Sequence, residues 1–172
     1  MKKTKPTAFI TGITGQDGSQ LAYLLLSNGY KVYGGYRKST NKLWRLDYLG
    51  ITEKITLIDF QLNEPQNVMA IIQKLKPNEF YHLAAESFIA DSFKYPNLVM
   101  SINTNSTCNI LEAIRIFSPN TRMFFASSSE IFGYSKSGEL LNESSKFYPS
   151  NPYAISKLSS EAPKWEKINV GF

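Results

Sequence analysis

The sequence has 172 residues, of which 42% are hydrophobic, 13% aromatic and 19% charged, and its formal net charge is +5 at pH 7. This length and composition predict one domain with a substantial core, and they exclude a disordered chain. No apolar run approaches the roughly eighteen residues of a membrane span, and the apolar stretch after the basic N-terminus is too short for a signal peptide.

Strands and helices alternate along the chain, as hydrophobic periodicity and turn residues indicate. In chain order we expect a strand over 8–11, a helix ending at Asn28-Gly29, a strand over 31–36, a short helix over 41–49, a strand over 54–59, a helix over 64–75, a strand over 79–84, a helix over 97–117, a strand over 121–126 and a helix from Pro152 that Pro163 stops. This order predicts an α/β fold with a doubly wound parallel sheet, Rossmann-like, with helices on both faces. Residues 158–172 carry little pattern, so no sixth strand is expected.

The positive charge is concentrated near the start of the chain. Residues 1–50 contain eight of the 19 basic residues and two of the 14 acidic residues, so the rest of the chain is close to neutral. No basic run is interleaved with aromatic residues, and no predicted helix has a basic face. A small polyanionic ligand explains such local charge as well as nucleic acid does, and the motifs below favour the ligand, so no nucleic-acid partner is expected.

The turn after the first expected strand is rich in glycine. Gly12, Gly15 and Gly18 have a GxxGxxG spacing, and the same turn opens the first helix. Glycines let backbone N–H groups approach a pyrophosphate closely, and the helix N-terminus adds a favourable dipole. The spacing therefore indicates a dinucleotide-binding turn, with a glycine-rich connection that binds nothing as the alternative.

The end of the second strand indicates which dinucleotide is bound. Enzymes that use NAD usually carry an acid there, which binds the ribose 2′-hydroxyl. Arg37 and Lys38 occupy this place, and basic side chains suit a 2′-phosphate, so NADP is favoured over the alternative of a solvated basic loop. Asp59 ends the third strand, where it can accept from the adenine amino group or cap the next helix.

Tyr153 and Lys157 form a YxxxK pair on the last expected helix. Residues i and i+4 share a helix face, so the ammonium is expected beside the phenol, where it favours a phenolate that can act as a base toward a hydroxyl. The segment 127–130, Ser-Ser-Ser-Glu, follows the fifth strand, and ligand chemistry in open α/β sheets occurs at the carboxyl ends of strands. These serines can hydrogen-bond a sugar hydroxyl, and Glu130 is a second acid or base; capping of the next helical turn is the alternative.

Two other residues are expected to be structural. His82 is the only histidine and lies at the end of a buried strand. Cys108 is the only cysteine, cannot form an internal disulfide, and is expected to pack in the core of a protein of the reducing cytoplasm. No metal site is expected.

The chain resembles the extended short-chain dehydrogenase/reductases, and within them the GDP-mannose 4,6-dehydratase family. The resemblance extends from residue 7 to about residue 158 and is carried by residues 10–19, 37–39, 82–87, 92–93, 95–96, 103, 110–115, 126–133 and 147–157. The run Gly-Gln-Asp-Gly-Ser at 15–19 is typical of that family, and a glutamate in the serine cluster separates the dehydratases from most sugar epimerases and reductases.

The resemblance implies a lyase that converts GDP-mannose to GDP-4-keto-6-deoxymannose by internal hydride transfer through bound NADP. Tyr153, assisted by Lys157, would remove the proton of the sugar C4 hydroxyl as hydride leaves C4. Glu130 would take the C5 proton, water would leave from C6, and hydride would return to C6. Ser128 would hold the C4 oxygen in place of the family's threonine.

The resemblance also implies the binding residues. The pyrophosphate would contact Gln16 and Asp17 beside the three glycines, and Arg37 and Lys38 would hold the 2′-phosphate. The nicotinamide and its ribose would contact Leu83, Ala84, Ala85, Tyr153 and Lys157. The GDP-sugar would contact Ser87, Ser128 and Ser129.

Several features depart from the family. Glu86 replaces a glutamine, and the loop 37–45 looks shorter, which argues against the family's homo-oligomer without excluding it. Residues 1–158 are interpreted as an NADP-binding domain and 159–172 as a divergent tail, with the family's substrate-binding domain absent. Three functions stay open: a dehydratase, active or a truncated inactive copy; a nucleotide-sugar epimerase or reductase; and a non-catalytic NADP-binding module.

Overall fold

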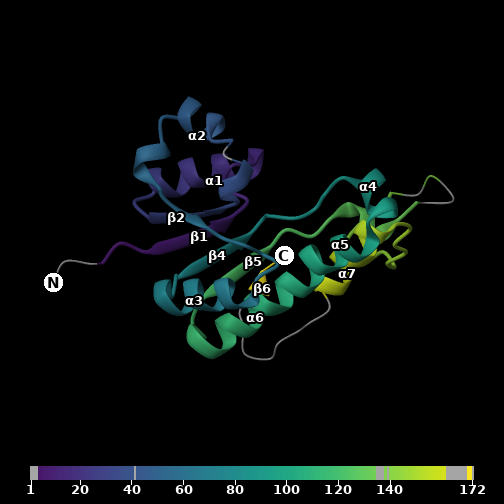
Figure 1. Ribbon diagram of the computed structural model, residues 1–172. Helices are drawn as coiled ribbons and strands as arrows, with labels where there is room; N and C mark the ends of the chain where they lie inside the picture. Colours follow the sequence, from purple (N-terminus) through teal and green to yellow (C-terminus); the bar gives the residue numbers. More distant parts are fainter. Residues whose placement is uncertain (1–3, 41, 135–137, 139, 162–169, 172) are drawn as a thin grey trace.

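The computed structural model describes residues 4–40, 42–134, 138, 140–161 and 170–171 (Figure 1). Its strands form one parallel sheet in the order β3-β2-β1-β4-β5-β6. The strands are β1 (Thr7–Thr11), β2 (Lys31–Tyr36), β3 (Thr56–Asp59), β4 (Glu79–His82), β5 (Arg122–Phe125) and β6 (Val170–Gly171). The doubly wound Rossmann-like fold expected from the sequence is confirmed.

Helices connect the strands and cover the sheet. The α-helices are α1 (Gln16–Ser27), α2 (Trp44–Tyr48), α3 (Pro65–Leu75), α4 (Ile89–Lys94), α5 (Pro96–Met100), α6 (Ser106–Phe117) and α7 (Pro152–Glu161). Shorter turns are the 3₁₀ helices η1 (Lys38–Thr40), η2 (Thr52–Lys54) and η4 (Ser129–Phe132), and a π-helical turn, η3 (Ser101–Asn105). In Figure 1, α1 and α2 cover one face of the sheet, and α3 and α6 cover the other.

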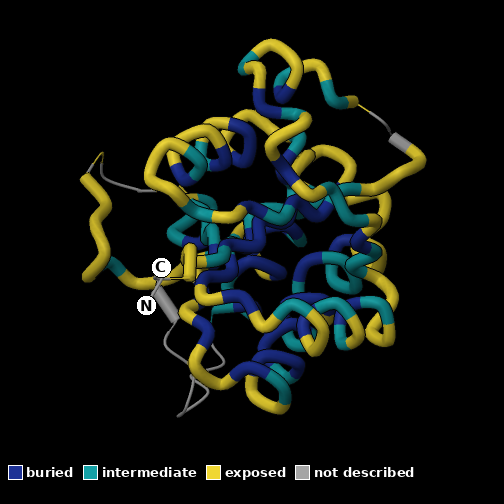
Figure 2. The backbone as a smooth tube through the Cα atoms, turned by 90° about the vertical axis from the view of Figure 1, so that its left-hand side faces the viewer, coloured by how far each residue is buried: buried dark blue, intermediate teal, exposed yellow. Residues whose placement is uncertain are grey.

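Each face of the sheet carries its own hydrophobic core. On one face, the Phe9 and Phe80 rings stack with their centres 5.0 Å apart, and Phe60 packs 4.9 Å from Phe9 under α3 and α6. On the other face, Ile10 and Ile13 are fully buried among side chains of α1 and α2. Each such side chain contributes about 1.5–3 kcal/mol of burial free energy. Figure 2 shows these buried segments in the interior and exposed segments around them.

The strand order contains one reversal that creates a crevice. The chain runs from β1 outward through β2 to β3, then crosses back so that β4 pairs with β1 on its other side. The connections leave the carboxyl ends of β1 and β4 in different directions, which opens a crevice between them, and ligands of such sheets bind there. The registers Thr11↔Gly35 and Thr11↔His82 bring the ends of β1, β2 and β4 to the same edge.

Three expectations need correction. The expected helix over 97–117 is α5 and α6 joined by the π turn Ser101–Asn105; no proline or glycine marks this interruption, because its residues keep right-handed helical backbone angles. A sixth strand is present, and Val170–Gly171 pairs with β5 through backbone groups that no side-chain pattern reveals. The helix expected over 41–49 is Trp44–Tyr48; Asn41, Pro163 and the tail residues 162–169 and 172 lie outside the described residues.

Candidate active site

The turn after β1 folds tightly enough to require glycine. Gly12 has a φ of +69°, and its carbonyl oxygen accepts from the Gly15 N–H over 2.9 Å. A Cβ on Gly18 would lie 2.4 Å from that same oxygen, and a Cβ on Gly12 would lie 3.0 Å from the backbone nitrogen of Ala84. Both sites therefore exclude a side chain, because the turn packs tightly on itself and against the segment after β4.

Helix α1 begins directly at this turn without a side-chain cap. Its N-cap is Gly15, and the exposed residues Gln16 and Asp17 form the start of the first turn. The first N–H groups of a helix have no partner within the helix, and in the described part of the chain no side-chain cap bond is made to this helix start. Free N–H groups, the helix dipole and a glycine cradle together fit a pyrophosphate, as expected from the sequence.

The basic pair after β2 lies beside Asp59. The backbone N–H of Lys38 donates to Asp59 Oδ1 over 3.3 Å, and the Gln61 amide donates to the same oxygen over 2.6 Å. The alternative that Asp59 caps helix α3 is wrong, because the N-cap of α3 is Glu64. Arg37 reaches the other way and pairs with Glu86, with 3.5 Å between Nη1 and Oε1.

The end of β4 is held against the glycine turn by Thr11, which the sequence analysis missed. Its hydroxyl oxygen accepts from the N–H groups of Leu83 (3.1 Å) and Ala84 (3.0 Å). The same hydroxyl lies 2.8 Å from His82 Nδ1, and His82 Nε2 lies 3.2 Å from the Thr107 hydroxyl. Burial, and then the charge of Lys157, lower the pKa of His82 to about 3, so the ring is neutral. The structural role expected for His82 is confirmed.

Tyr153 and Lys157 lie on α7 and face the end of β5. Both are buried, and the Lys157 ammonium lies 5.9 Å from the centre of the Tyr153 ring and 4.8 Å from that of Phe125. Its Nζ donates to the Ala126 carbonyl over 2.6 Å, which anchors α7 to β5. Burial lowers the pKa of Lys157 to about 8, so the group is mostly charged at pH 7. The expected proximity of ammonium and phenol ring is confirmed.

The serine cluster follows β5 at the same edge. Ser128 Oγ accepts from the Glu130 N–H over 3.3 Å and caps the 3₁₀ helix η4, so the capping alternative is confirmed for this residue. The Ser127 hydroxyl is buried and has no hydrogen-bond partner within the described part of the chain. Ser129 is exposed at the start of η4, and Ser87 is exposed after β4.

Asn151 joins the cluster to α7, and the sequence analysis missed it. Its side-chain amide donates to Glu130 Oε2 over 2.9 Å, while its Oδ1 accepts from the Ala154 N–H over 2.7 Å. Asn151 is therefore both the N-cap of α7 and the anchor of Glu130. Asn followed by proline at the first helical position is a start signal that could have identified the cap, though not the contact with Glu130.

Asn103, in the π turn, is a third residue to which the sequence analysis assigned no role. Its buried amide accepts from the Glu86 N–H (2.9 Å) and donates to the Glu86 carbonyl (3.1 Å) and to Ser156 Oγ (2.9 Å). It therefore ties the segment after β4 to the helix that carries Tyr153. A buried amide with a partner 53 residues away leaves no mark in local sequence.

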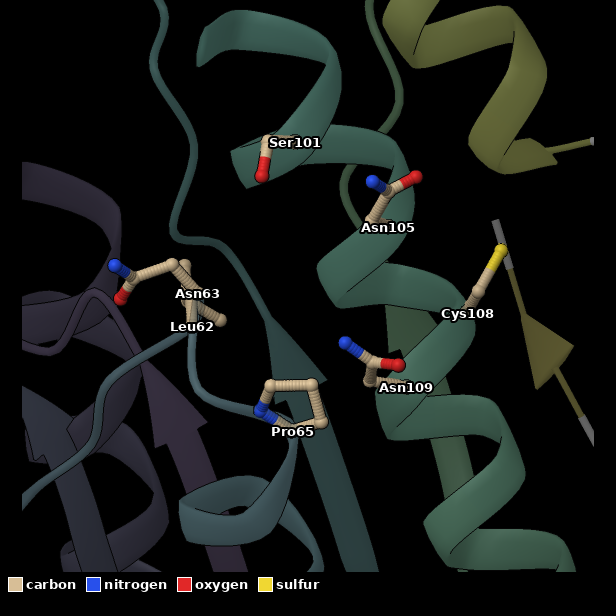
Figure 3. Close-up of a pocket in the computed structure, with 7 residues that line it drawn as sticks. All are labelled: Leu62, Asn63, Pro65, Ser101, Asn105, Cys108 and Asn109. Atoms are coloured by element: carbon tan, nitrogen blue, oxygen red, sulfur yellow. The ribbon is translucent and has the colours of Figure 1, made fainter.

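A hollow of about 380 Å³ lies between the loop after β3 and the α5–α6 region. Figure 3 shows its lining residues, which are Leu62, Asn63, Pro65, Ser101, Asn105, Cys108 and Asn109. Cys108 lines this hollow and is half-buried, and it is not part of the buried clusters on either face of the sheet, so its expected place in the core is wrong. Over the described ranges, no three His, Cys, Asp or Glu side chains gather to hold a metal ion.

Within the described residues, no helix is both long and apolar enough to cross a membrane.

These features define a class of protein: a Rossmann-like domain of the short-chain dehydrogenase/reductase type, with a glycine-rich turn after β1 and a Tyr-Lys helix at the sheet edge. The chain belongs to the GDP-mannose 4,6 dehydratase family, whose sequence pattern matches residues 9–163.

Relatives and solved structures agree with this assignment. A GDP-mannose 4,6-dehydratase of Vibrio cholerae is 36% identical over 90% of this chain, which covers 43% of that protein. A putative epimerase of Burkholderia cenocepacia is 28% identical, with a TM-score of 0.82, over 96% of this chain and 52% of the other. A UDP-glucose 4-epimerase of Thermus thermophilus in complex with NAD is 26% identical, with a TM-score of 0.80, over 90% and 48%. The chain thus spans less than half the length of the dehydratase it matches.

Proposed function

We propose that this chain is the cofactor-binding part of a GDP-mannose 4,6-dehydratase and carries its acid–base residues. The observation that carries the proposal is the position of Glu130, which Asn151 holds at the start of the helix that bears Tyr153 and Lys157. A dehydratase needs one base for a hydroxyl and a second for a carbon acid, and the edge offers a phenol and a carboxylate. Residues 1–158 form the proposed cofactor domain.

The proposed cofactor is NADP. The glycine cradle and the uncapped start of α1 suit its pyrophosphate, and Arg37 and Lys38 suit its 2′-phosphate. Asp59 lies beside this pair, at the adenine end, and Leu83, Ala84 and Ala85 lie at the nicotinamide end. A bound nicotinamide supplies a hydride acceptor for C4 of the sugar and a hydride donor for C6. The buried Ser127 hydroxyl has no hydrogen-bond partner among the described residues, so it has a hydrogen bond left to make at this edge.

The side chains divide the proton transfers among them. Tyr153 takes the proton of the C4 hydroxyl, and the Lys157 ammonium lies 5.9 Å from the centre of its ring. Ser128 holds the C4 oxygen, with Ser87 and Ser129 nearby for the sugar. Glu130 takes the C5 proton that the 4-keto group has acidified and passes it to the C6 hydroxyl, which leaves as water. When hydride returns to C6, C5 takes up one proton, and the proton that Tyr153 took from the C4 hydroxyl balances this step.

Incubation of the purified chain with GDP-mannose and NADP tests the proposal. A 4-keto product formed without added reductant is expected, and Glu130→Gln should abolish it. Glu143→Gln removes the same charge from an exposed side chain and should leave the rate unchanged. Dehydration that survives Glu130→Gln would refute the role of Glu130.

A nucleotide-sugar epimerase or reductase is the second candidate, because epimerases are among the solved structures of the same fold at 26–28% identity. Consumption of NADPH by the chain would favour a reductase, and an epimeric sugar would favour an epimerase. Bound NADP without turnover of any nucleotide sugar would favour a binding module.

A further inference from the structure

Arg37 and Glu86 form an ion pair across the crevice. Arg37 follows β2 and Glu86 follows β4, and β1 with its glycine turn lies between these two strands. The pair joins Nη1 and Oε1 over 3.5 Å, with 59% of the arginine side chain and 36% of the glutamate side chain exposed. Two side chains that follow the strands on either side of β1 therefore meet.

The backbone on both sides of this pair is fixed. Asp59 accepts from the N–H of Lys38, the residue after Arg37. Asn103, only 2% exposed, accepts from the N–H of Glu86 and donates to its carbonyl. The Glu86 carboxylate therefore contacts Arg37 from a segment whose backbone is held in place.

We propose that Glu86 weakens the preference for NADP over NAD by competing with the 2′-phosphate for Arg37. This rests on the proposed binding of NADP in the crevice. A 2′-phosphate that pairs with Arg37 meets a second anion already at that guanidinium, and like charges repel. The 2′-hydroxyl of NAD is neutral and meets no such repulsion. Glu86 therefore lowers the preference for NADP over NAD that Arg37 creates.

The size of the effect follows from the exposure of the pair. Exposed ion pairs contribute little free energy, so losing this one should change a binding constant by about two- to five-fold. The effect should shrink in salt on the order of 0.5 M, where such charges are screened.

Binding constants for NADP and NAD, measured by titration calorimetry on the full chain, test the proposal. Glu86→Gln keeps the shape of the side chain and should tighten NADP about two- to five-fold while changing NAD little. Glu53→Gln removes one charge from an exposed residue of η2 and should change neither constant. In the Arg37→Met background, the gain from Glu86→Gln should shrink.

The outcomes separate this inference from the proposed function. An unchanged ratio of the two affinities in Glu86→Gln, with both dinucleotides bound, would overturn the competition alone. An equal tightening of NADP in the Arg37 and Arg37→Met backgrounds would show that Glu86 does not act through Arg37. No binding of either dinucleotide to any form of the chain would overturn the proposed function as well.

Discussion

The side chain of Asn151 performs two separable tasks, and substitution there tests how Glu130 is positioned. Asn151→Ala removes the N-cap bond to Ala154 and the hydrogen bond to the Glu130 carboxylate. Loss of a cap costs about 0.5–2 kcal/mol, and the bond to a partly hydrated carboxylate adds less than a fully buried one would. We expect the free energy of unfolding to fall by about 1–3 kcal/mol.

Asn151→Asp separates the two tasks. An aspartate oxygen still accepts from the Ala154 N–H, so the cap survives, but it cannot donate to Glu130 and instead opposes it with a like charge. The free energy of unfolding of this variant, measured by urea denaturation, should therefore lie within about 1 kcal/mol of the parent value. Its dehydration rate should fall about 10- to 100-fold, as in Asn151→Ala, because the base is misplaced.

Asn97→Ala, an exposed substitution on α5, serves as the control and should alter neither quantity. Parental dehydration by Asn151→Asp would refute the anchoring of Glu130 by Asn151. Parental stability of Asn151→Ala would refute the cap.

Three further predictions follow from particular contacts. Gly18→Ala places a Cβ 2.4 Å from the Gly12 carbonyl oxygen, so calorimetry should find NADP affinity lowered at least about tenfold and urea unfolding a loss of about 1–3 kcal/mol; parental affinity would contradict the cradle. Burial raises the pKa of Glu79, but hydrogen bonds from Tyr81, Arg122 and Tyr30 outweigh burial and lower that pKa overall. The free energy of unfolding should therefore fall as the pH drops below about 4.5. Glu79→Gln should weaken that pH dependence. Burial lowers the pKa of Lys157 to about 8, so the ammonium loses its proton above that pH and kcat/KM should decline there. Because His82 is neutral, the pH profile should contain no histidine step near pH 6.5. A kcat/KM that stays constant above about pH 8 would contradict the role of the Lys157 charge.

Much of the fold could be predicted because it depends on local signals. Glycine spacing, strand runs such as 31–36, and the amphipathic pattern of 64–75 each report a local backbone state. The YxxxK spacing likewise placed Tyr153 and Lys157 on one face of a helix, so the proximity of their side chains could be predicted. The parallel sheet followed from the alternation of these elements.

The rest depends on contacts between distant segments. Asn103 joins two segments through hydrogen bonds to Glu86 and Ser156, and neither of these residues is near it in sequence. The ion pair of Arg37 and Glu86 needs the strand order that places β1 between them. Strand β6 consists of two residues paired through backbone groups, so hydrophobic periodicity cannot reveal it.

The central claim is that the hydride removed from C4 returns to C6 of the same sugar, while Glu130 removes the C5 proton. GDP-mannose labelled with deuterium at sugar C4 tests it in one reaction with the chain and NADP. We expect a 4-keto product that carries the deuterium at C6, and we expect none from Glu130→Gln. A product without deuterium at C6, or the labelled product from Glu130→Gln at the parental rate, would contradict the account.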